Sequence, residues 1–337
     1  MVHAFLLPLV VSLLSLVCGY DEAELVFAGD AMMHSAQLDA ARRADGTYDY
    51  SECFTALEPF IKSAELAVVN LETPVGTPPY AGYPCFSAPE SYVSALADAG
   101  FDLFLTANNH TLDRRDRGLC NTVATLDRMG LAHLGTYVSD SARRAEIPKV
   151  LTVNNMRLGF LNYTYGTNGI TPGPRVVVDY IDPARIAADV EATRRAGAEF
   201  VIVTIHWGDE YHLLPNASQR NLARKMALEM GVDLIIGAHP HVVQPLEYID
   251  DPSAGRRVPV VYSLGNFISN MKTTDTRGGA MARVRLTRDP RGKIHVSDAA
   301  MHYVFTLPPD ATTRQFRVVP VDSTADPRAR QFLKNLK

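Results

Sequence analysis

Short apolar runs of strand length alternate with stretches of helical periodicity over most of the chain. In residues 51–62 the apolar positions recur at helical spacing, whereas residues 200–205 are continuously apolar. Asp182 and Pro183 mark a helix start, as cap and first helical residue. The pattern predicts strands at 25–28, 66–69, 103–105, 200–205 and 232–236, and helices at 51–62, 89–99, 118–129, 183–196 and 216–230.

Strand patterns dominate the remaining segments. Residues 150–153 and 158–161 predict a hairpin that turns at Asn154 and Asn155, because asparagine tolerates left-handed backbone. Strands alternating with helices, followed by a strand-rich end, predict a layered α/β sandwich, and residues 324–337 are expected to form a frayed tail. The strands predicted near the C-terminus cover 258–264, 282–286, 293–296, 303–307 and 316–321.

The first 19 residues differ from the rest of the chain. Residues 5–17 form an almost unbroken apolar run, which is short for a membrane span and typical of a signal peptide. We therefore expect residues 1–19 to be a signal peptide of an exported protein, periplasmic or at the cell surface. Lipid anchoring through Cys18 is one alternative, and an apolar N-terminal strand or helix of a cytosolic protein is another.

Composition narrows the possible functions. With 337 residues the chain can bury a full core, and its formal net charge of -4 argues against non-specific nucleic-acid binding. Cys53, Cys85 and Cys120 include no C-x-x-C pair, so a thiolate zinc site is not expected. Cys53 and Cys85 either form a bridge or stay as free thiols.

Five polar clusters follow the predicted strands. Carboxylate, amide and imidazole groups are the ligands that hold hard or borderline metal ions, and open α/β sheets bind ligands beyond the carboxyl ends of strands. Together the clusters predict a dinuclear metal site and chemistry on phosphate or another anionic group. They are Gly29-Asp30, Asn70-Leu71-Glu72, Asn108-Asn109-His110, His206-Trp207-Gly208-Asp209-Glu210 and Gly237-Ala238-His239-Pro240-His241.

The cluster at 237–241 is the strongest single element. Pro240 favours an extended backbone at His239, and residues two apart in extended chain share a face, so His239 and His241 are expected to point at one spot. A polar turn with two hydrogen-bonded histidines is the alternative. His206 is interpreted as a ligand or as a capped strand end. Glu210 and Tyr211 are interpreted as contacts to the substrate or to residues that support the ligands, or as part of a solvated loop.

The clusters in the first half suggest distinct roles. Asp30 follows a glycine, where backbone can approach a metal or anion closely, and Glu72 offers a carboxylate that bridges two ions. Asn109 can donate an amide oxygen, and His110 beside it is suited to protonating a leaving oxygen. Each has a plainer interpretation as a turn or surface residue. Asp113 either orients His110 or caps the next helix.

Arg114, Arg115 and Arg117 follow the Asn-Asn-His turn closely. They either attract an anionic substrate or form a solvated helix start.

In this order the clusters resemble the CapA/PgsA family of poly-γ-glutamate capsule-synthesis proteins, whose domain is similar to the calcineurin-like metallophosphoesterases. The resemblance implies a four-layer α/β/β/α sandwich of the metallophosphoesterase type, a domain over 24–270, and extra C-terminal strands of the same domain over 271–323. The matching stretches are Gly29-Asp30-Ala31-Met32, Asn70-Leu71-Glu72-Thr73-Pro74, Ala107-Asn108-Asn109-His110, Leu161-Asn162-Tyr163-Thr164, His206-Trp207-Gly208, Gly237-Ala238-His239-Pro240-His241 and Tyr262-Ser263-Leu264-Gly265-Asn266-Phe267.

The resemblance also implies two divalent metal ions, of manganese, magnesium, zinc or iron. The implied ligands are Asp30 and His241 for the first ion, Asn109, His206 and His239 for the second, and Glu72 as the bridge. His110, with Asp113, matches the catalytic histidine. The candidate substrate contacts are Asn70, Asn108, Glu210 and Asn266.

Two positions depart from the resemblance. Met32 stands where a metallophosphoesterase would have a histidine ligand, and a thioether is a poor ligand for these ions, while His34 is out of register. Arg115 stands where many capsule-family members have glycine. The expected function is a metal-dependent, phosphoesterase-like hydrolase acting on an anionic polymer or a phosphorylated envelope substrate. The alternative is a non-catalytic polymer-binding or scaffold subunit of a membrane-associated synthase.

Overall fold

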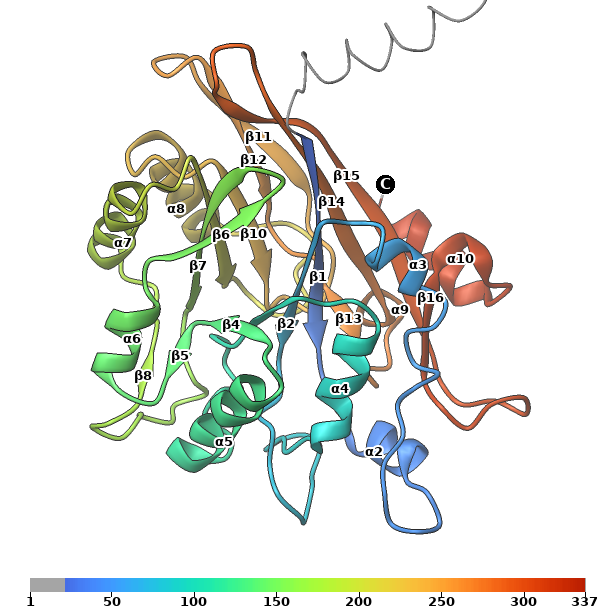
Figure 1. The fold of residues 1–337 in the computed structure, drawn as a ribbon. Coiled ribbons are helices and arrows are strands. Elements are labelled where there is room, and N and C mark those ends of the chain that lie inside the picture. The colour runs from blue at the N-terminus through green and yellow to red at the C-terminus, as the bar shows by residue number, and fades with distance from the viewer. Residues whose placement is uncertain (1–21, 337) are drawn as a thin grey trace, which may run out of the picture.

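Two β-sheets pack face to face, and helices cover their outer faces (Figure 1). The structure is a computed structural model that describes residues 22–336, so the expected signal peptide and Cys18 lie outside the described residues. The four-layer α/β/β/α sandwich implied by the resemblance is confirmed. Within residues 22–336, none of the helices has the length and apolar character needed to cross a membrane.

The first sheet combines parallel strands from the N-terminal half with the C-terminal strands. Its strand order is β16-β15-β14-β1-β2-β3-β4, and β13 also pairs with β1. The C-terminal strands therefore extend the sheet that begins with β1. Its strands are β1 (Glu22–Ala31), β2 (Leu66–Leu71), β3 (Leu103–Leu105), β4 (Ala132–Leu134), β13 (Asn266–Ile268), β14 (Gly278–Arg288), β15 (Ile294–Leu307) and β16 (Arg317–Pro320).

The second sheet has the order β11-β12-β10-β9-β7-β6. A small two-stranded sheet of β5 (Thr136–Tyr137) and β8 (Val177–Val178) lies apart from it. The six strands are β6 (Lys149–Val153), β7 (Met156–Thr164), β9 (Phe200–His206), β10 (Leu234–Ala238), β11 (Leu246–Asp251) and β12 (Arg256–Val261).

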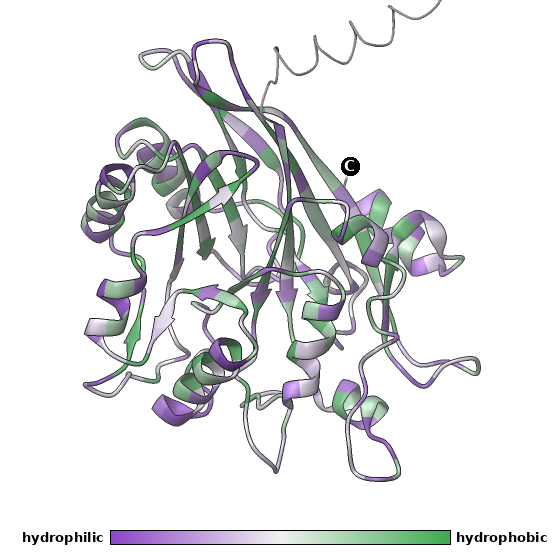
Figure 2. Cartoon of the chain, in the orientation of Figure 1, coloured by the Kyte–Doolittle hydropathy of each residue, from purple (hydrophilic) through white to green (hydrophobic). Residues whose placement is uncertain are grey.

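The layers follow from which side each strand residue faces. Leu25 and Phe27 of β1 join the core between the sheets, whereas Val26 and Ala28 join the core under the helices. In β9, Ile202 likewise faces the other sheet, and its neighbours on either side face helices. The central strands of both sheets are therefore buried on two faces, and Figure 2 shows hydrophobic stretches along the strands and hydrophilic positions on the helices beside them.

Helices lie on both outer faces, whereas α10 contributes Ala329 and Phe332 to the core between the sheets. The core outside the first sheet contains side chains of α2, α3 and α4, and the core outside the second sheet contains those of α7 and α8. The helices are α2 (Ser35–Ala41), α3 (Glu58–Ile61), α4 (Glu90–Asp98), α5 (Arg115–Arg128), α6 (Asp140–Glu146), α7 (Pro183–Arg195), α8 (Ala217–Leu228), α9 (Thr274–Arg277), α10 (Pro327–Asn335) and the 3₁₀ turn η1 (Val321–Ser323).

The predicted hairpin is confirmed, since β6 and β7 pair across Asn154 and Asn155 with φ of 43° and 62°. The helix expected over 51–62 was wrong in extent, because only the last turn, α3, is helical. The strands predicted at 293–296 and 303–307 are one strand, β15, paired with β14.

The frayed tail expected after residue 324 was also wrong. Helix α10 begins at Pro327 after the cap Asp326 and buries Ala329 and Phe332.

The bridge considered between Cys53 and Cys85 is absent from the described part of the chain. Cys53 is buried, Cys85 is exposed, and both are free thiols.

Candidate metal centre

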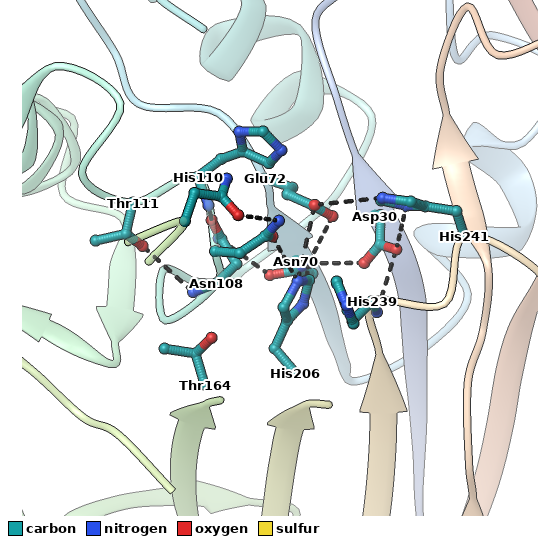
Figure 3. Close-up of polar contacts among 12 residues, drawn as sticks. Asp30, Asn70, Glu72, Asn108, His110, Thr111, Thr164, His206, His239 and His241 are labelled. Carbon is teal, nitrogen blue, oxygen red and sulfur yellow. Dashed lines mark hydrogen bonds and ion pairs between the residues drawn. The ribbon is translucent and has the colours of Figure 1, made fainter. Parts of the chain in front are cut away.

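The candidate site lies where the carboxyl ends of strands from both sheets meet. β1, β2 and β3 run parallel in the first sheet, and β9 and β10 run parallel in the second. Figure 3 shows side chains that end or follow these strands converging on one region. All six predicted metal ligands are buried there: Asp30, Glu72, Asn109, His206, His239 and His241.

Glu72 lies between two histidines of the second sheet. Its Oε1 is 3.7 Å from His206 Nε2 and 3.9 Å from His241 Nε2, and it has no hydrogen-bond partner among residues 22–336. Burial, and then the charge of Asp30, raises the pKa of Glu72 well above its ordinary value. A buried acceptor without a donor costs about 1–3 kcal/mol. A divalent cation would supply the missing partner.

Asp30 is held by several donors. Its Oδ1 accepts a hydrogen bond from Asn70 Nδ2 at 2.8 Å, and its Oδ2 lies 3.2 Å from His241 Nδ1. The backbone N–H of His239 donates to the same Oδ2 at 3.3 Å. Burial alone would raise the pKa of Asp30, but the hydrogen bond to His241 and the nearby His206 lower it to about 2. Asp30 is therefore an anionic group at neutral pH.

Two of the imidazoles are neutral. Burial lowers the pKa of His239 to about 3 and that of His206 well below its ordinary value, and neighbouring histidines act in the same direction. Neutral imidazole is the form that binds metal ions. His206 Nε2 lies 2.9 Å from Asn109 Oδ1, and His239 Nδ1 has no partner within the described residues.

The backbone at the two histidines after β10 differs from the prediction. His239 has φ of 102° and His241 has φ of 58°, so the extended conformation expected from Pro240 was wrong. The two imidazoles nevertheless approach, with ring centroids 5.9 Å apart. Left-handed backbone at residues other than glycine costs of order 1–3 kcal/mol, and such strain is concentrated at functional sites.

The glycine before Asp30 has a packing role. A Cβ at Gly29 would lie 1.9 Å from the carbonyl oxygen of Gly265, and the backbone N–H of Asp30 donates to that carbonyl at 3.0 Å. The expectation that Gly29 lets the backbone approach an ion stays a prediction. The close neighbour is the backbone at Gly265, and this contact fixes the position of Asp30.

His110 is oriented by Asp113. Its Nδ1 lies 2.8 Å from Asp113 Oδ2, and the same carboxylate oxygen accepts a hydrogen bond from the backbone N–H of Phe86 at 2.7 Å. The ring of Phe86 meets the imidazole edge to face, with centroids 4.6 Å apart. Arg114, not Asp113, is the N-cap of α5. Of the two interpretations of Asp113, the structure favours orientation of His110.

Three of the predicted substrate contacts are buried amides. Asn70 donates to Asp30 and lies 3.4 Å from Asn108, whose Nδ2 donates to the carbonyl of Leu71 at 2.9 Å. Asn266 Oδ1 lies 3.0 Å from His241 Nδ1. All three amides are therefore engaged within the protein, and Asn70 and Asn266 contact predicted metal ligands directly.

The fourth predicted substrate contact, Glu210, is exposed. It lies beyond β9, and its carboxylate comes within reach of His239 and His241.

The structure shows where the two residues that depart from the family pattern, Met32 and Arg115, lie. The side chain of Met32 is buried, and His34 lies at the start of α2 with its ring edge-on to Phe86 at 5.3 Å. Arg115 has φ of 55°, so it adopts the left-handed conformation that glycine would favour. Arg115 and Arg117 are exposed in the first turn of α5.

Sequence reasoning named Tyr211 but missed the other two tyrosines of an aromatic rim. Tyr83 and Tyr165 are exposed, and their rings lie 6.4 Å from His110 and 4.5 Å from His239. Tyr211 completes the rim at 6.2 Å from His241. The sequence could have indicated Tyr165, because this residue directly follows the strand β7, and β7 is parallel to β9, which ends at His206.

These residues fit a divalent metal centre. Ligand atoms about 2 Å from one ion are roughly 3–4 Å apart, which matches the spacing around Glu72. The donors are carboxylate oxygens and neutral imidazoles, and two of the buried donor atoms have no other partner within residues 22–336. The site can therefore accept divalent cations.

Comparison with known proteins shows similarity in sequence to one family and similarity in fold to solved structures. Residues 24–271 match the family described as bacterial capsule synthesis protein PGA_cap. The PGA biosynthesis protein CapA of Bacillus subtilis is 28% identical over 84% of this chain and 72% of its own length. The capsule biosynthesis protein CapA of Bacillus anthracis is 25% identical over 79% of this chain, which spans only 64% of that relative.

Among solved structures, the NAD nucleotidase NadN of Haemophilus influenzae has a similar fold. The TM-score is 0.54 at 14% identity, over 94% of this chain and 63% of that one. At this identity the likeness concerns the fold alone.

Proposed function

This chain belongs to the bacterial capsule synthesis protein family, and we propose that it is a metal-dependent hydrolase acting in capsule or cell-envelope polymer biosynthesis. The observation that carries the proposal is the environment of the carboxylate oxygen Oε1 of Glu72. This oxygen is buried, lacks a partner among residues 22–336, and lies within 3.9 Å of ring nitrogens of His206 and His241. A phosphate ester or a related anionic centre is the substrate group that such a site would attack.

The chain's own residues would divide the work. Divalent ions held by the six ligands would supply Lewis acidity and activated water. Asp113 holds His110 through Nδ1, which leaves Nε2 free to protonate a leaving oxygen as general acid. Asn70, Asn108 and Asn266 would position Asp30, Glu72 and His241, in place of the substrate contacts first predicted for them.

The partners and the location are part of the proposal. The Bacillus subtilis relative is named for PGA biosynthesis, which supports an anionic polymer or a phosphorylated envelope molecule as substrate. Export, to the periplasm or the cell surface, with or without a lipid on Cys18, would bring the chain to that substrate and to membrane synthase subunits. No nucleic-acid partner is proposed, given the net charge of -4.

Turnover of p-nitrophenyl phosphate and of bis-p-nitrophenyl phosphate with Mn²⁺, Zn²⁺ or Mg²⁺ tests the proposal. We expect hydrolysis that stops when a chelator is added, and a loss of roughly 10²–10⁴-fold in His110→Ala. His133→Asn is the matched control, because His133 is also paired with an aspartate, Asp127, but outside the site. Absence of metal-dependent turnover on these esters and on phosphorylated envelope substrates would contradict the proposal.

A non-catalytic polymer-binding subunit is the second candidate. It is favoured by Met32, whose buried thioether stands where the related phosphoesterases would have an imidazole ligand. Elemental analysis separates the two, because about two ions per chain favours the hydrolase and none favours the scaffold.

A further inference from the structure

The candidate metal centre contains two separate groups of ligand atoms. Within residues 22–336, one group is Asp30, Glu72 and His206, and the other is Glu210, His239 and His241. In each group the ligand atoms lie within 4.8 Å of one another. Glu210 had been expected to contact substrate, yet its carboxylate comes close to two buried imidazoles.

The environment of His239 indicates that the second group is incomplete without a bound ion. Its side chain is 3% exposed, and Nδ1 has no hydrogen-bond partner among the described residues. The ring is enclosed by Tyr165 and His206, with centroids 4.5 and 4.8 Å away. A buried imidazole nitrogen without a partner is destabilising unless something binds it.

The backbone holds Glu210 beside these histidines. The N–H of Tyr211 donates to the carbonyl of Pro240 at 2.8 Å, which ties the segment after β9 to the one after β10. Gly208, with φ of 93°, allows the chain to turn back immediately after the strand. Glu210 is therefore placed by a direct hydrogen bond between neighbouring residues, although its side chain is exposed.

Met32 explains why another ligand is needed. Its sulfur is a poor ligand for hard ions, so the centre has one strong donor fewer than the related phosphoesterases would offer. A carboxylate oxygen from Glu210 would restore that donor from a different strand end. The donor set of one carboxylate and two imidazoles suits zinc, iron or manganese, and three protein ligands leave positions open for water or substrate.

We propose that Glu210 is a metal ligand, binding a divalent cation together with His239 and His241 at the open edge of the centre. This inference rests on the proposed metal-dependent function, but it assigns a different role to one residue.

Titration of metal-free full-length chain with Mn²⁺, followed by calorimetry and by electron paramagnetic resonance, tests this role. In the unsubstituted protein we expect two ions per chain and the spectrum of a coupled manganese pair. Glu210→Gln should bind one ion at least about 100-fold more weakly, beyond the loss typical of residues that only support a ligand, and should give the six-line spectrum of isolated Mn²⁺. Asp209→Asn, the same charge change one residue away, should bind both ions.

The possible outcomes separate this inference from the proposed function. If the unsubstituted protein binds no metal, both fail. If Glu210→Gln keeps two ions, unchanged affinity and a coupled spectrum, the role of Glu210 is wrong and the metal-dependent function stands. Circular dichroism of each variant verifies folding. Should Glu210→Gln fold poorly, Glu210→Ala removes the carboxylate as well, and an unchanged affinity for both ions in that variant would also overturn the assignment.

Discussion

Single residues with unusual backbone angles cluster around the candidate centre. His239, His241 and Tyr211 have φ of 102°, 58° and 67°, and all three lie in the segments after β9 and β10. Each such residue is disfavoured by roughly 1–3 kcal/mol, so the surrounding structure must fix it. The close contact between Gly237 and the carbonyl of Tyr262 is part of that support, because a Cβ there would lie 2.0 Å from the oxygen.

Arg115 gives a test of such strain outside the ligand set. Its φ of 55° disfavours any side chain with a Cβ, and the residue is exposed. We expect Arg115→Gly to raise the free energy of unfolding by about 0.5–1 kcal/mol, because relief of strain exceeds the added flexibility of the unfolded chain. Urea denaturation measures it. Arg115→Ala keeps the Cβ and should show no such gain, so equal effects of the two substitutions would contradict the explanation.

His34 makes stability depend on pH. Burial lowers the pKa of His34 to about 4, from 6.5 in the unfolded chain. Between pH 6.5 and 4 the unfolded chain takes up a proton that the folded chain refuses, so the free energy of unfolding falls as the pH falls. We expect His34→Asn to remove on the order of 2 kcal/mol of that fall. Urea titrations of metal-free protein at pH 7, 5.5 and 4.5 measure it, and equal slopes in both proteins would exclude His34.

At the scale of elements, the sequence predicts strand ends better than element boundaries. Polar residues after apolar runs located Asp30, Glu72 and His206 correctly, because parallel strands bring their carboxyl ends to one edge. The helix over 51–62 shrank to α3, since periodicity alone does not show which turns are helical. Strand β15 was divided in two, because much of it is partly exposed and carries a weak pattern.

Positive φ angles and contacts between distant segments were not predictable. Pro240 favours extended chain at His239, but the packing after β10 overrides this local preference. The contact of Gly29 with Gly265 joins residues far apart in sequence, so no local pattern reveals it. The position of Glu210 likewise depends on the hydrogen bond between Tyr211 and Pro240.

The C-terminal helix can be tested as an integral element. Phe332 of α10 is 1% exposed, and a Cβ at Gly278 of β14 would lie 2.4 Å from its ring. We expect Gly278→Ala to destabilise by about 1–3 kcal/mol through overpacking, and Phe332→Ala by about 3–5 kcal/mol. In the Phe332→Ala background Gly278→Ala should cost little, because the ring is gone. Strictly additive losses by urea denaturation would mean that α10 does not pack on β14.

At the scale of the whole molecule, the centre joins the two sheets. Asp30, Glu72 and Asn109 belong to strands of the first sheet or follow them. His206, His239 and His241 end or follow strands of the second. Cations held there would connect the sheets at one edge, while the apolar core between them contains residues such as Phe27 and Ile202. Metal binding should therefore affect the stability of the entire domain.

Removing the metal should lower the melting temperature of the whole chain. A ligand at 100 times its dissociation constant adds about 2.7 kcal/mol, which corresponds to roughly 4 °C for a domain of this size. Glu72→Gln should behave differently, because the amide keeps the shape but removes a buried carboxyl beside Asp30. We expect this variant to be more stable than metal-free wild-type protein and to gain less stability from added Mn²⁺ or Zn²⁺ than wild type does. Calorimetry with and without a chelator measures both effects, and Glu229→Gln, at an exposed carboxylate after α8, should respond to metal like wild type. If Glu72→Gln were stabilised by metal as much as wild type, Glu72 would not be a ligand, and the two sheets would not be joined through it.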